Sequence, residues 1–200
     1  MESKVAAILE AKGFTPANTL LCTSLCCDEL ARNLEDDLNK VYGHNFNLGG
    51  LSGFPFAGNT GFGAMSAHVP DNGFCLLVHG PTLVLPRMEL SERSNEQELP
   101  SLTTAGAVQE LILPHGKRLN DADVRMKELP YALYDSQDIL VRDIINGGKG
   151  GIKQGLALLS GIQINTAPDT QDYFHPLRFD YYDSEGNVVE SMLESLTVSE

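Results

Sequence analysis

The chain has 200 residues, of which 42% are hydrophobic and 20% charged, and its formal net charge is −13. These proportions predict one soluble globular domain over residues 1–200, long enough to bury a sizeable core. The negative charge argues against nucleic acid and anionic membranes as partners, because both bind clustered Lys and Arg, and no apolar run approaches the roughly 20 residues of a membrane span.

The N-terminal third predicts a helix, a buried strand and a second helix. Residues 2–12 have an amphipathic helical pattern that Gly13 ends, and the continuous apolar run 18–26 suits a buried strand of a parallel sheet. Residues 27–43 follow as a helix with a regular apolar stripe at Leu30, Leu34, Leu38 and Val41. The stretch "SLCCDELAR" (24–32) therefore spans the junction between strand and helix, where open α/β sheets commonly bind ligands.

The middle of the chain is rich in glycine and then in polar residues. Within the glycine-rich stretch 46–73, only residues 60–68 suggest a short helix. A second apolar strand is expected over 74–86, broken by "GP". Residues 87–100 are polar and predict a surface loop.

The second half predicts two helices, a strand and a hairpin. Residues 103–113 read as a short helix and residues 121–147 as a longer one that breaks near Pro130, followed by a glycine-rich connector at 147–151. A third buried strand is expected over 155–168, and 177–193 alternates around a turn, as a hairpin does. The pattern as a whole predicts an α/β fold with a mainly parallel central sheet flanked by helices, with an N-terminal helix (1–13) and a terminal strand and tail (178–200).

Three residues of the strand–helix junction have side chains suited to metal chemistry. Cys26 at a helix N-terminus could supply a thiolate to zinc, Asp28 could hydrogen-bond a metal-bound water, and Arg32, four residues on, could keep that carboxylate ionised. A purely structural reading is also open. Cys26 would then be a small core residue, and Asp28 would complement the helix dipole.

Other polar residues also allow two readings. His68 could be a nitrogen ligand of the same metal or a hydrogen-bonded structural histidine, and Cys75 and His79 share one face of a strand, where packing is the more common role. The glycine-rich stretch lacks the Lys-Ser or Lys-Thr of a phosphate-binding loop.

The cysteines give little support to redox chemistry. Cys22 and Cys26 on one extended strand would lie about 13 Å apart, beyond the roughly 7 Å between Cα atoms that a disulfide allows. Three of the four cysteines crowd into residues 22–27, which is poor spacing for a disulfide framework, and the first residues lack a secretory or transit pattern. Reduced thiols in a reducing compartment are therefore expected.

Three stretches together resemble one protein family. "SLCCDELARNLEDDL", "FNLGGLSGFPFAGNTGFGAMSAHVPDNG" and "LLSGIQINTAPDTQDYFHP" are similar to the limiting-CO2-inducible B/C proteins, over about residues 12–180. This family has a β-carbonic-anhydrase-like fold and is related to the θ-carbonic anhydrases. The resemblance implies a homodimer, located in the cytoplasm or the plastid stroma, that acts on CO2 and bicarbonate.

The resemblance also implies a zinc site. Active family members bind Zn2+ through Cys, His and Cys and hydrate CO2 to bicarbonate beside an Asp–Arg pair. Carried over by motif, Cys26 is the first thiolate ligand, His68 is the imidazole ligand, and Asp28 and Arg32 are the catalytic pair.

Two positions depart from the family pattern. Ala105 stands where the second ligand cysteine belongs, and Thr82 replaces the histidine of the family's "G-P-H" after the second strand. Thr104 is a poor zinc ligand, and a substitute third ligand would have to come from Cys27, Cys75 or His79. Three hypotheses follow: a zinc-dependent carbonic anhydrase with an unexpected third ligand, a catalytically silent member acting as a binding or assembly partner in inorganic-carbon handling, and a metal enzyme with a changed activity.

Overall fold

The computed structural model describes residues 2–27, 32–84, 122–165 and 173–197. In these parts of the chain the strands form one sheet in the order β2-β1-β3-β5-β6-β7, with β4 paired to β5 beside it. The strands are β1 (Thr19–Ser24), β2 (Asn45–Asn47), β3 (Phe74–His79), β4 (Thr82–Val84), β5 (Gly155–Asn165), β6 (Tyr173–Asp183) and β7 (Val188–Ser191).

The sheet is mainly parallel, as predicted. β1 pairs in parallel with β2 and β3, and β5 pairs in parallel with β3 and β4, whereas β6 and β7 are antiparallel. The apolar runs that predicted buried strands form β1, β3 and β5, which lie in the middle of the sheet with helices on both faces. The alternating C-terminal pattern instead forms β6 and β7 at one edge.

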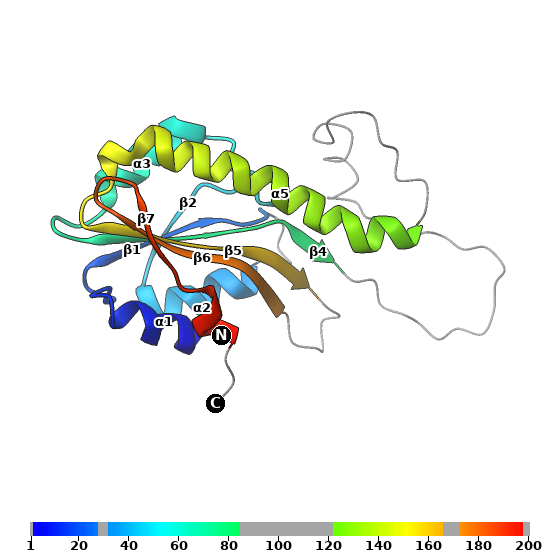
Figure 1. Ribbon diagram of the computed structural model, residues 1–200, viewed down its shortest axis with the longest axis horizontal. Coiled ribbons are helices and arrows are strands. Elements are labelled where there is room, and N and C mark those ends of the chain that lie inside the picture. The colour runs from blue at the N-terminus through cyan, green and yellow to red at the C-terminus, as the bar shows by residue number, and fades with distance from the viewer. Residues whose placement is uncertain (1, 28–31, 85–121, 166–172, 198–200) are drawn as a thin grey trace.

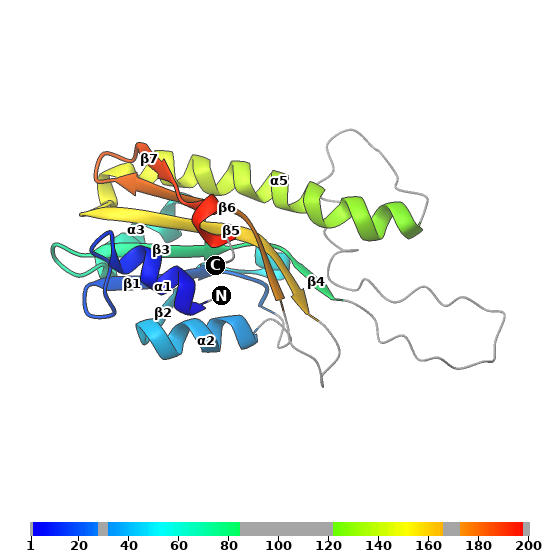
Figure 2. The ribbon, with the colours of Figure 1, turned by 60° about the horizontal axis from the view of Figure 1, so that its bottom comes forward.

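Helices cover the two faces of the sheet in separate groups (Figure 1). The described helical segments are α1 (Glu2–Glu10), α2 (Arg32–Tyr42), η2 (Leu51–Gly53), α3 (Gly58–His68), α5 (Ala122–Gly148), η3 (Lys149–Gly151) and α6 (Leu193–Thr197). Buried side chains of α1 and α2 form one core with the sheet, against which α6 packs, and those of α3 and α5 form a second core on the opposite face. Figure 2 shows α1 and α2 side by side on their face of the sheet.

The long helix α5 continues through Pro130, where the sequence predicted a break. A proline removes one helical hydrogen bond and disturbs the turn before it. The helix after Pro130 buries Leu133, Val141 and Ile145 against the sheet, and this packing holds the element in place. The helix also takes in the first two glycines of the expected connector, and η3 occupies the rest.

Several predicted segments lie outside the described residues. These are the first turn of the helix expected over 27–43, the loop expected over 87–100 and the helix expected over 103–113. None of the helices that the structure describes combines the length and apolar character that a bilayer crossing demands.

The carboxyl ends of β1 and β3 meet at one edge of the sheet. Ser24 at the end of β1 pairs with His79 at the end of β3, so the chain leaves both strands at this end of the sheet, with Cys26 after β1 and Thr82 after β3. Backbones pack very closely here, because a Cβ atom on Gly80 would lie 1.8 Å from the carbonyl oxygen of Gly161. This carboxyl end of the sheet, with Ser24, Cys26, His79 and the η2 loop, is called the cysteine edge below and is the candidate functional site.

Candidate functional site

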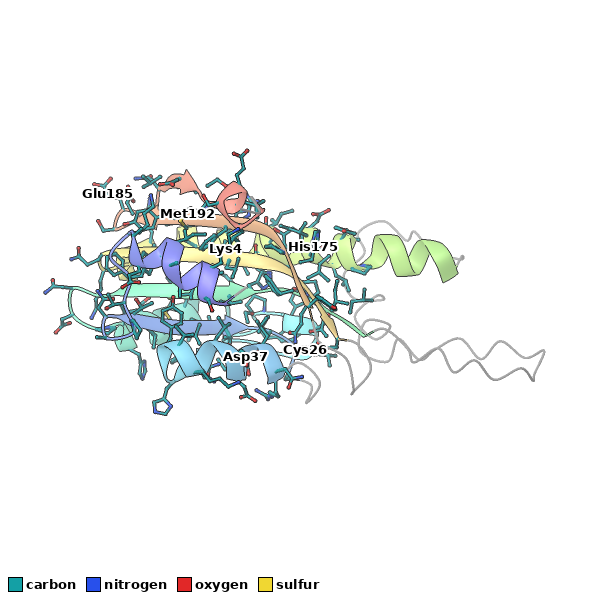
Figure 3. All side chains as sticks on the ribbon, turned by 90° about the horizontal axis from the view of Figure 1, so that it is seen from below. Lys4, Cys26, Asp37, His175, Glu185 and Met192 are labelled. Carbon is teal, nitrogen blue, oxygen red and sulfur yellow. The ribbon has the colours of Figure 1, made fainter. Side chains whose placement is uncertain are left out.

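Cys26 lies just beyond β1, at the edge of the sheet near the start of α2 (Figure 3). Its side chain is only 2% exposed, and its Sγ accepts a hydrogen bond from the backbone N–H of Ser52 at 3.3 Å. Cys27 next to it is exposed, and its N–H donates to the carbonyl of Gly50. The first predicted ligand is therefore a buried sulfur held against the glycine-rich loop.

The loop around η2 is clamped from several sides. Ser52 has φ 55° and ψ 28°, a left-handed conformation that costs a residue other than glycine about 1–2 kcal/mol. The Gln137 side chain on α5 donates its Nε2–H to the Ser52 carbonyl at 2.8 Å, and Ser24 Oγ donates to the Gly53 carbonyl at 2.8 Å. These bonds hold the Ser52 N–H beside Cys26.

Arg32 forms an ion pair that the sequence analysis did not predict. Its Nη1 donates to Glu35 Oε2 at 2.8 Å, one helical turn further on, and its Nη2 donates to the Cys27 carbonyl at 3.4 Å. Asp28 lies outside the described residues, so the Asp28–Arg32 pair stays a prediction.

Glu35 is a buried carboxylate that the sequence reasoning missed. It is 4% exposed, and its Oε1 accepts hydrogen bonds from Thr23 Oγ1 at 2.6 Å and Asn47 Nδ2 at 2.8 Å. The available signal was its spacing, because Glu35 is one turn before Leu38 and so shares the buried face of α2. Together with the bond from Arg32, these hydrogen bonds fix the position of Arg32 and link β1 to β2.

His68 lies at the opposite end of the sheet from Cys26. It is the last residue of α3, is exposed, and its Nδ1 lies 2.8 Å from the Ala64 carbonyl. Its ring packs on Phe46 with centroids 5.1 Å apart, and Phe46 pairs with Cys22 in the sheet. The next residue, Val69, accepts a hydrogen bond from Lys153 just before β5, so His68 lies near the amino ends of β3 and β5, whereas Cys26 follows the carboxyl end of β1.

Thr82 occupies the position where the family's "G-P-H" pattern has histidine. It begins β4 and pairs with Gln163 of β5. Its Oγ1 is buried and has no hydrogen-bond partner in the described part of the chain. A neutral hydroxyl is a far weaker zinc ligand than imidazole or thiolate.

Within the described residues, the donor set at this edge does not fit a catalytic zinc ion. Such an ion takes three protein ligands, normally His, Cys, Asp or Glu, and leaves one position for water. Among residues 2–27, 32–84, 122–165 and 173–197, no three side chains of these types gather in a way that could hold a metal. Ala105, which lies outside these ranges, has no donor atom on its side chain.

Cys75 and His79, two further candidate ligands, are both buried. Burial raises the pKa of the Cys75 thiol to about 12, and this thiol contacts the sulfur of Met65 at 3.5 Å. Burial also lowers the pKa of His79 to about 4, so its imidazole is neutral at pH 7. Cys75 therefore has the expected packing role, and neither residue belongs to a group of three possible metal ligands in the described residues.

A second polar centre lies under α5, around Asp138. This carboxylate is 4% exposed and accepts two hydrogen bonds from Arg178, at 2.8 and 3.1 Å, and one from Arg142 at 3.0 Å. Burial raises its pKa, but the hydrogen bonds and charge of Arg178, aided by Arg142, outweigh this and leave the pKa below its usual value. Tyr134 and Ser160 contact the same carboxylate at 3.4 Å.

The Asp138 centre ties α5 to the antiparallel part of the sheet. Arg178 on β6 also donates to Asp180 at 2.7 Å, so one guanidinium joins two carboxylates. The sequence places Asp138 and Arg178 forty residues apart, and no local pattern links them. Only the pairing of β5 with β6 beneath α5 brings them together.

An apolar groove of about 580 Å³ lies beyond this centre, between α5 and the ends of β5 and β6. Tyr131 and His175, the latter marked in Figure 3, meet edge to face across it with ring centroids 6.4 Å apart. The lining includes Leu83 but not Cys26, Ser52 or Thr82. The groove is thus separate from the cysteine edge.

The neutral His79 predicts a pH-dependent stability. Its pKa of about 4 in the folded state lies below the ordinary 6.5, so between these values the unfolded chain binds a proton that the folded chain does not. Stability therefore falls as pH falls, by about 2–3 kcal/mol between pH 7.5 and 4.5 at 1.4 kcal/mol per pKa unit. Urea unfolding at both pH values measures it. His79→Gln should flatten the pH dependence and the exposed His44→Gln should not; equal slopes in all three proteins would refute the assignment.

The fold and the cysteine edge together define a carbonic-anhydrase-like α/β protein. The family model for limiting CO2-inducible proteins B/C, β-carbonic anhydrases, matches residues 1–85 and 85–183. The chain therefore belongs to the limiting CO2-inducible B/C family.

Solved structures agree with this assignment. A point mutant of PtLCIB4, described as a homolog of the limiting CO2-inducible protein LCIB, is 36% identical, with a TM-score of 0.85 over 96% of this chain and 91% of that one. Unmutated PtLCIB4 is 34% identical, with a TM-score of 0.74 over 95% and 93%. LCIB itself is 18% identical with a TM-score of 0.62 over 94% and 90%, which shows the shared fold. No curated protein sequence matches significantly.

Proposed function

We propose that this chain is a catalytically silent carbonic-anhydrase-like protein that acts as a binding or assembly partner in inorganic-carbon handling. The observation that carries the proposal is the donor set at the carboxyl edge of the sheet. In the described residues no group of three possible metal ligands is found there, and position 82, a histidine in the family pattern, is a threonine.

The chemistry of hydration explains why this donor set matters. A zinc ion would lower the pKa of a bound water to about 7 and so supply the hydroxide that attacks CO2. Catalytic zinc needs three protein ligands, so one thiolate with a weakly binding alcohol would lose the ion to water. The Cys26 sulfur is instead engaged by the Ser52 N–H inside the protein.

The fold supports the partner role. The similarity to PtLCIB4 covers 96% of this chain, whereas Ala105 stands where the resemblance places the second ligand cysteine and Thr82 replaces the histidine of the "G-P-H" pattern. A retained scaffold without the reaction centre suits a protein that is recognised by another chain. We propose a homodimer as its basic unit and a protein of inorganic-carbon uptake or storage as its partner.

A stopped-flow assay of CO2 hydration, with added Zn2+, tests the loss of activity. The protein should accelerate hydration no more than the Cys26→Ser variant does, because the thiol carries no active metal. A matched control is Cys27→Ser, which changes the exposed neighbouring cysteine. Hydration well above the uncatalysed rate that disappears only in Cys26→Ser would refute the proposal and favour a zinc enzyme with an unexpected ligand.

A further inference from the structure

Three polar side chains near the cysteine edge are wholly buried, yet each has an atom without a hydrogen-bond partner among the residues that the structure describes. They are His79 (0% exposed), Gln137 (0%) and Ser52 (1%), and the atoms are His79 Nε2, Gln137 Oε1 and Ser52 Oγ. Buried polar atoms are almost always hydrogen-bonded, to protein or to ordered water. We propose that these three side chains bind an internal water molecule that joins β3, α5 and the η2 loop.

The three residues belong to one connected region. Gln137 bonds the Ser52 carbonyl, and the next residue, Gly53, accepts a hydrogen bond from Ser24. His79 Nδ1 lies 3.3 Å from the Ser24 carbonyl, which closes the connection from α5 through the loop to β3. A Cβ atom on Gly53 would come within 2.3 Å of the Gly80 carbonyl, so the loop also abuts the residue after His79.

The hydrogen-bonding roles of these atoms determine what can bind. A carbonyl only accepts, so the contact with Ser24 makes His79 Nδ1 the donor and leaves Nε2 of the neutral ring as an acceptor. Gln137 gives its Nε2–H to the Ser52 carbonyl, which leaves Oε1 as a second acceptor. The Ser52 hydroxyl can donate or accept.

This pattern selects a neutral molecule with two hydrogens to donate. Water donates to both His79 Nε2 and Gln137 Oε1 and accepts from Ser52 Oγ, which satisfies every atom. Bicarbonate is a poor fit, because it has one O–H and places negative charge against two acceptors. Burying that charge without a cation costs several kcal/mol. The interior beside Cys26 is thus a hydration site and not a bicarbonate site.

The bound water has a structural consequence for the cysteine edge. Ser52 has a left-handed backbone that needs support from its surroundings. A water on its hydroxyl adds a link from the loop to His79, beside the existing link from its carbonyl to Gln137. Together these links hold the Ser52 N–H at the Cys26 sulfur.

A crystal structure of the unaltered protein at about 1.5 Å or better, with and without added bicarbonate, tests the proposal. A single round density peak at about 2.7–3.1 Å from both His79 Nε2 and Gln137 Oε1, the same in both crystals, is the expected result. Planar three-lobed density only with bicarbonate would overturn it in favour of an anion site. An anomalous zinc peak, or no density at all, would also overturn it.

A variant pair adds a measurement in solution. Gln137→Leu removes one acceptor, and Ser136→Ala is its control, because the Ser136 hydroxyl bonds the Ala132 carbonyl of its own helix. In unaltered protein and in Ser136→Ala, ¹H–¹⁵N spectra should show a His79 imidazole protonated on Nδ1 with a nuclear Overhauser contact from a long-lived water. Loss of that contact in Gln137→Leu supports the site. An unchanged contact in a folded Gln137→Leu protein would show that the water lies elsewhere.

Discussion

Replacing Thr82 by His together with Ala105 by Cys is expected to raise the zinc content from near zero to about one ion per chain. The change restores the histidine of the family's "G-P-H" pattern at position 82, where the Thr82 hydroxyl is buried and has no partner among the described residues. It also restores the thiolate that the family pattern places at position 105. Structural zinc sites bind with apparent free energies of about 10–16 kcal/mol, so the expected difference is large. Elemental analysis after dialysis measures it.

Single changes and controls make this prediction specific. Thr82→His alone should raise zinc content only slightly, because two protein ligands are fewer than zinc requires. Adding Cys26→Ser to the double variant should remove the ion, whereas adding His68→Ala should not, since His68 packs on Phe46 at the other end of the sheet. A double variant that holds no zinc would show that position 105 does not meet Cys26 in the folded chain. Loss of zinc on His68→Ala would return His68 to the ligand set.

Asp138→Ala is expected to destabilise the protein by about 3 kcal/mol. The substitution leaves Arg178 with only Asp180 and removes the partner of Arg142, while Tyr134 and Ser160 lose a shared acceptor. This destabilisation is at the lower end of the range for breaking a buried ion pair, because Arg178 is 30% exposed and water can solvate part of its charge. Urea unfolding at pH 7 gives the free energy directly.

The matched control for this change is Asp143→Ala on the same helix. Asp143 is exposed, so its loss should change stability by less than about 0.5 kcal/mol. Arg178→Lys should fall between the two, because an ammonium cannot bind Asp138 with two parallel hydrogen bonds. Equal stabilities of the Asp138 and Asp143 variants would show that the Asp138 centre makes no net contribution to the free energy of unfolding, as is true of some buried ion pairs.

Sequence patterns predicted most of the elements because each element carries its own periodicity. The apolar runs at 18–26, 74–86 and 155–168 became the central strands, and the apolar stripe of the second helix became the buried face of α2. The junction at Cys26 followed from these elements, since the carboxyl ends of parallel strands lie at one edge. The prediction of a break at Pro130 was wrong, because the packing of α5 outweighs one lost hydrogen bond.

The members of the candidate site were harder to predict than its location. His68 was grouped with Cys26 because both types bind metal, but their sequence separation contained no information on which end of the sheet each would reach. Helical spacing predicts Asp28 as a partner of Arg32 and equally allows Glu35, which the structure shows in an ion pair with Arg32. Spacing alone does not reveal that Glu35 is buried and bonded to Thr23 and Asn47, and the Asp28–Arg32 pair stays a prediction because Asp28 lies outside the described residues.

The sequence by itself determined the α/β class, the buried strand just before Cys26, and the identities of Thr82 and Ala105 that depart from the family pattern, because periodicity and residue identity are local properties. Only the tertiary structure decided that His68 lies away from Cys26, that Asp138 joins Arg178, and that His79, Gln137 and Ser52 share a buried polar region. These are contacts between residues up to 85 positions apart. Such contacts depend on strand order and on how α5 crosses the sheet, and no short stretch of the sequence specifies either.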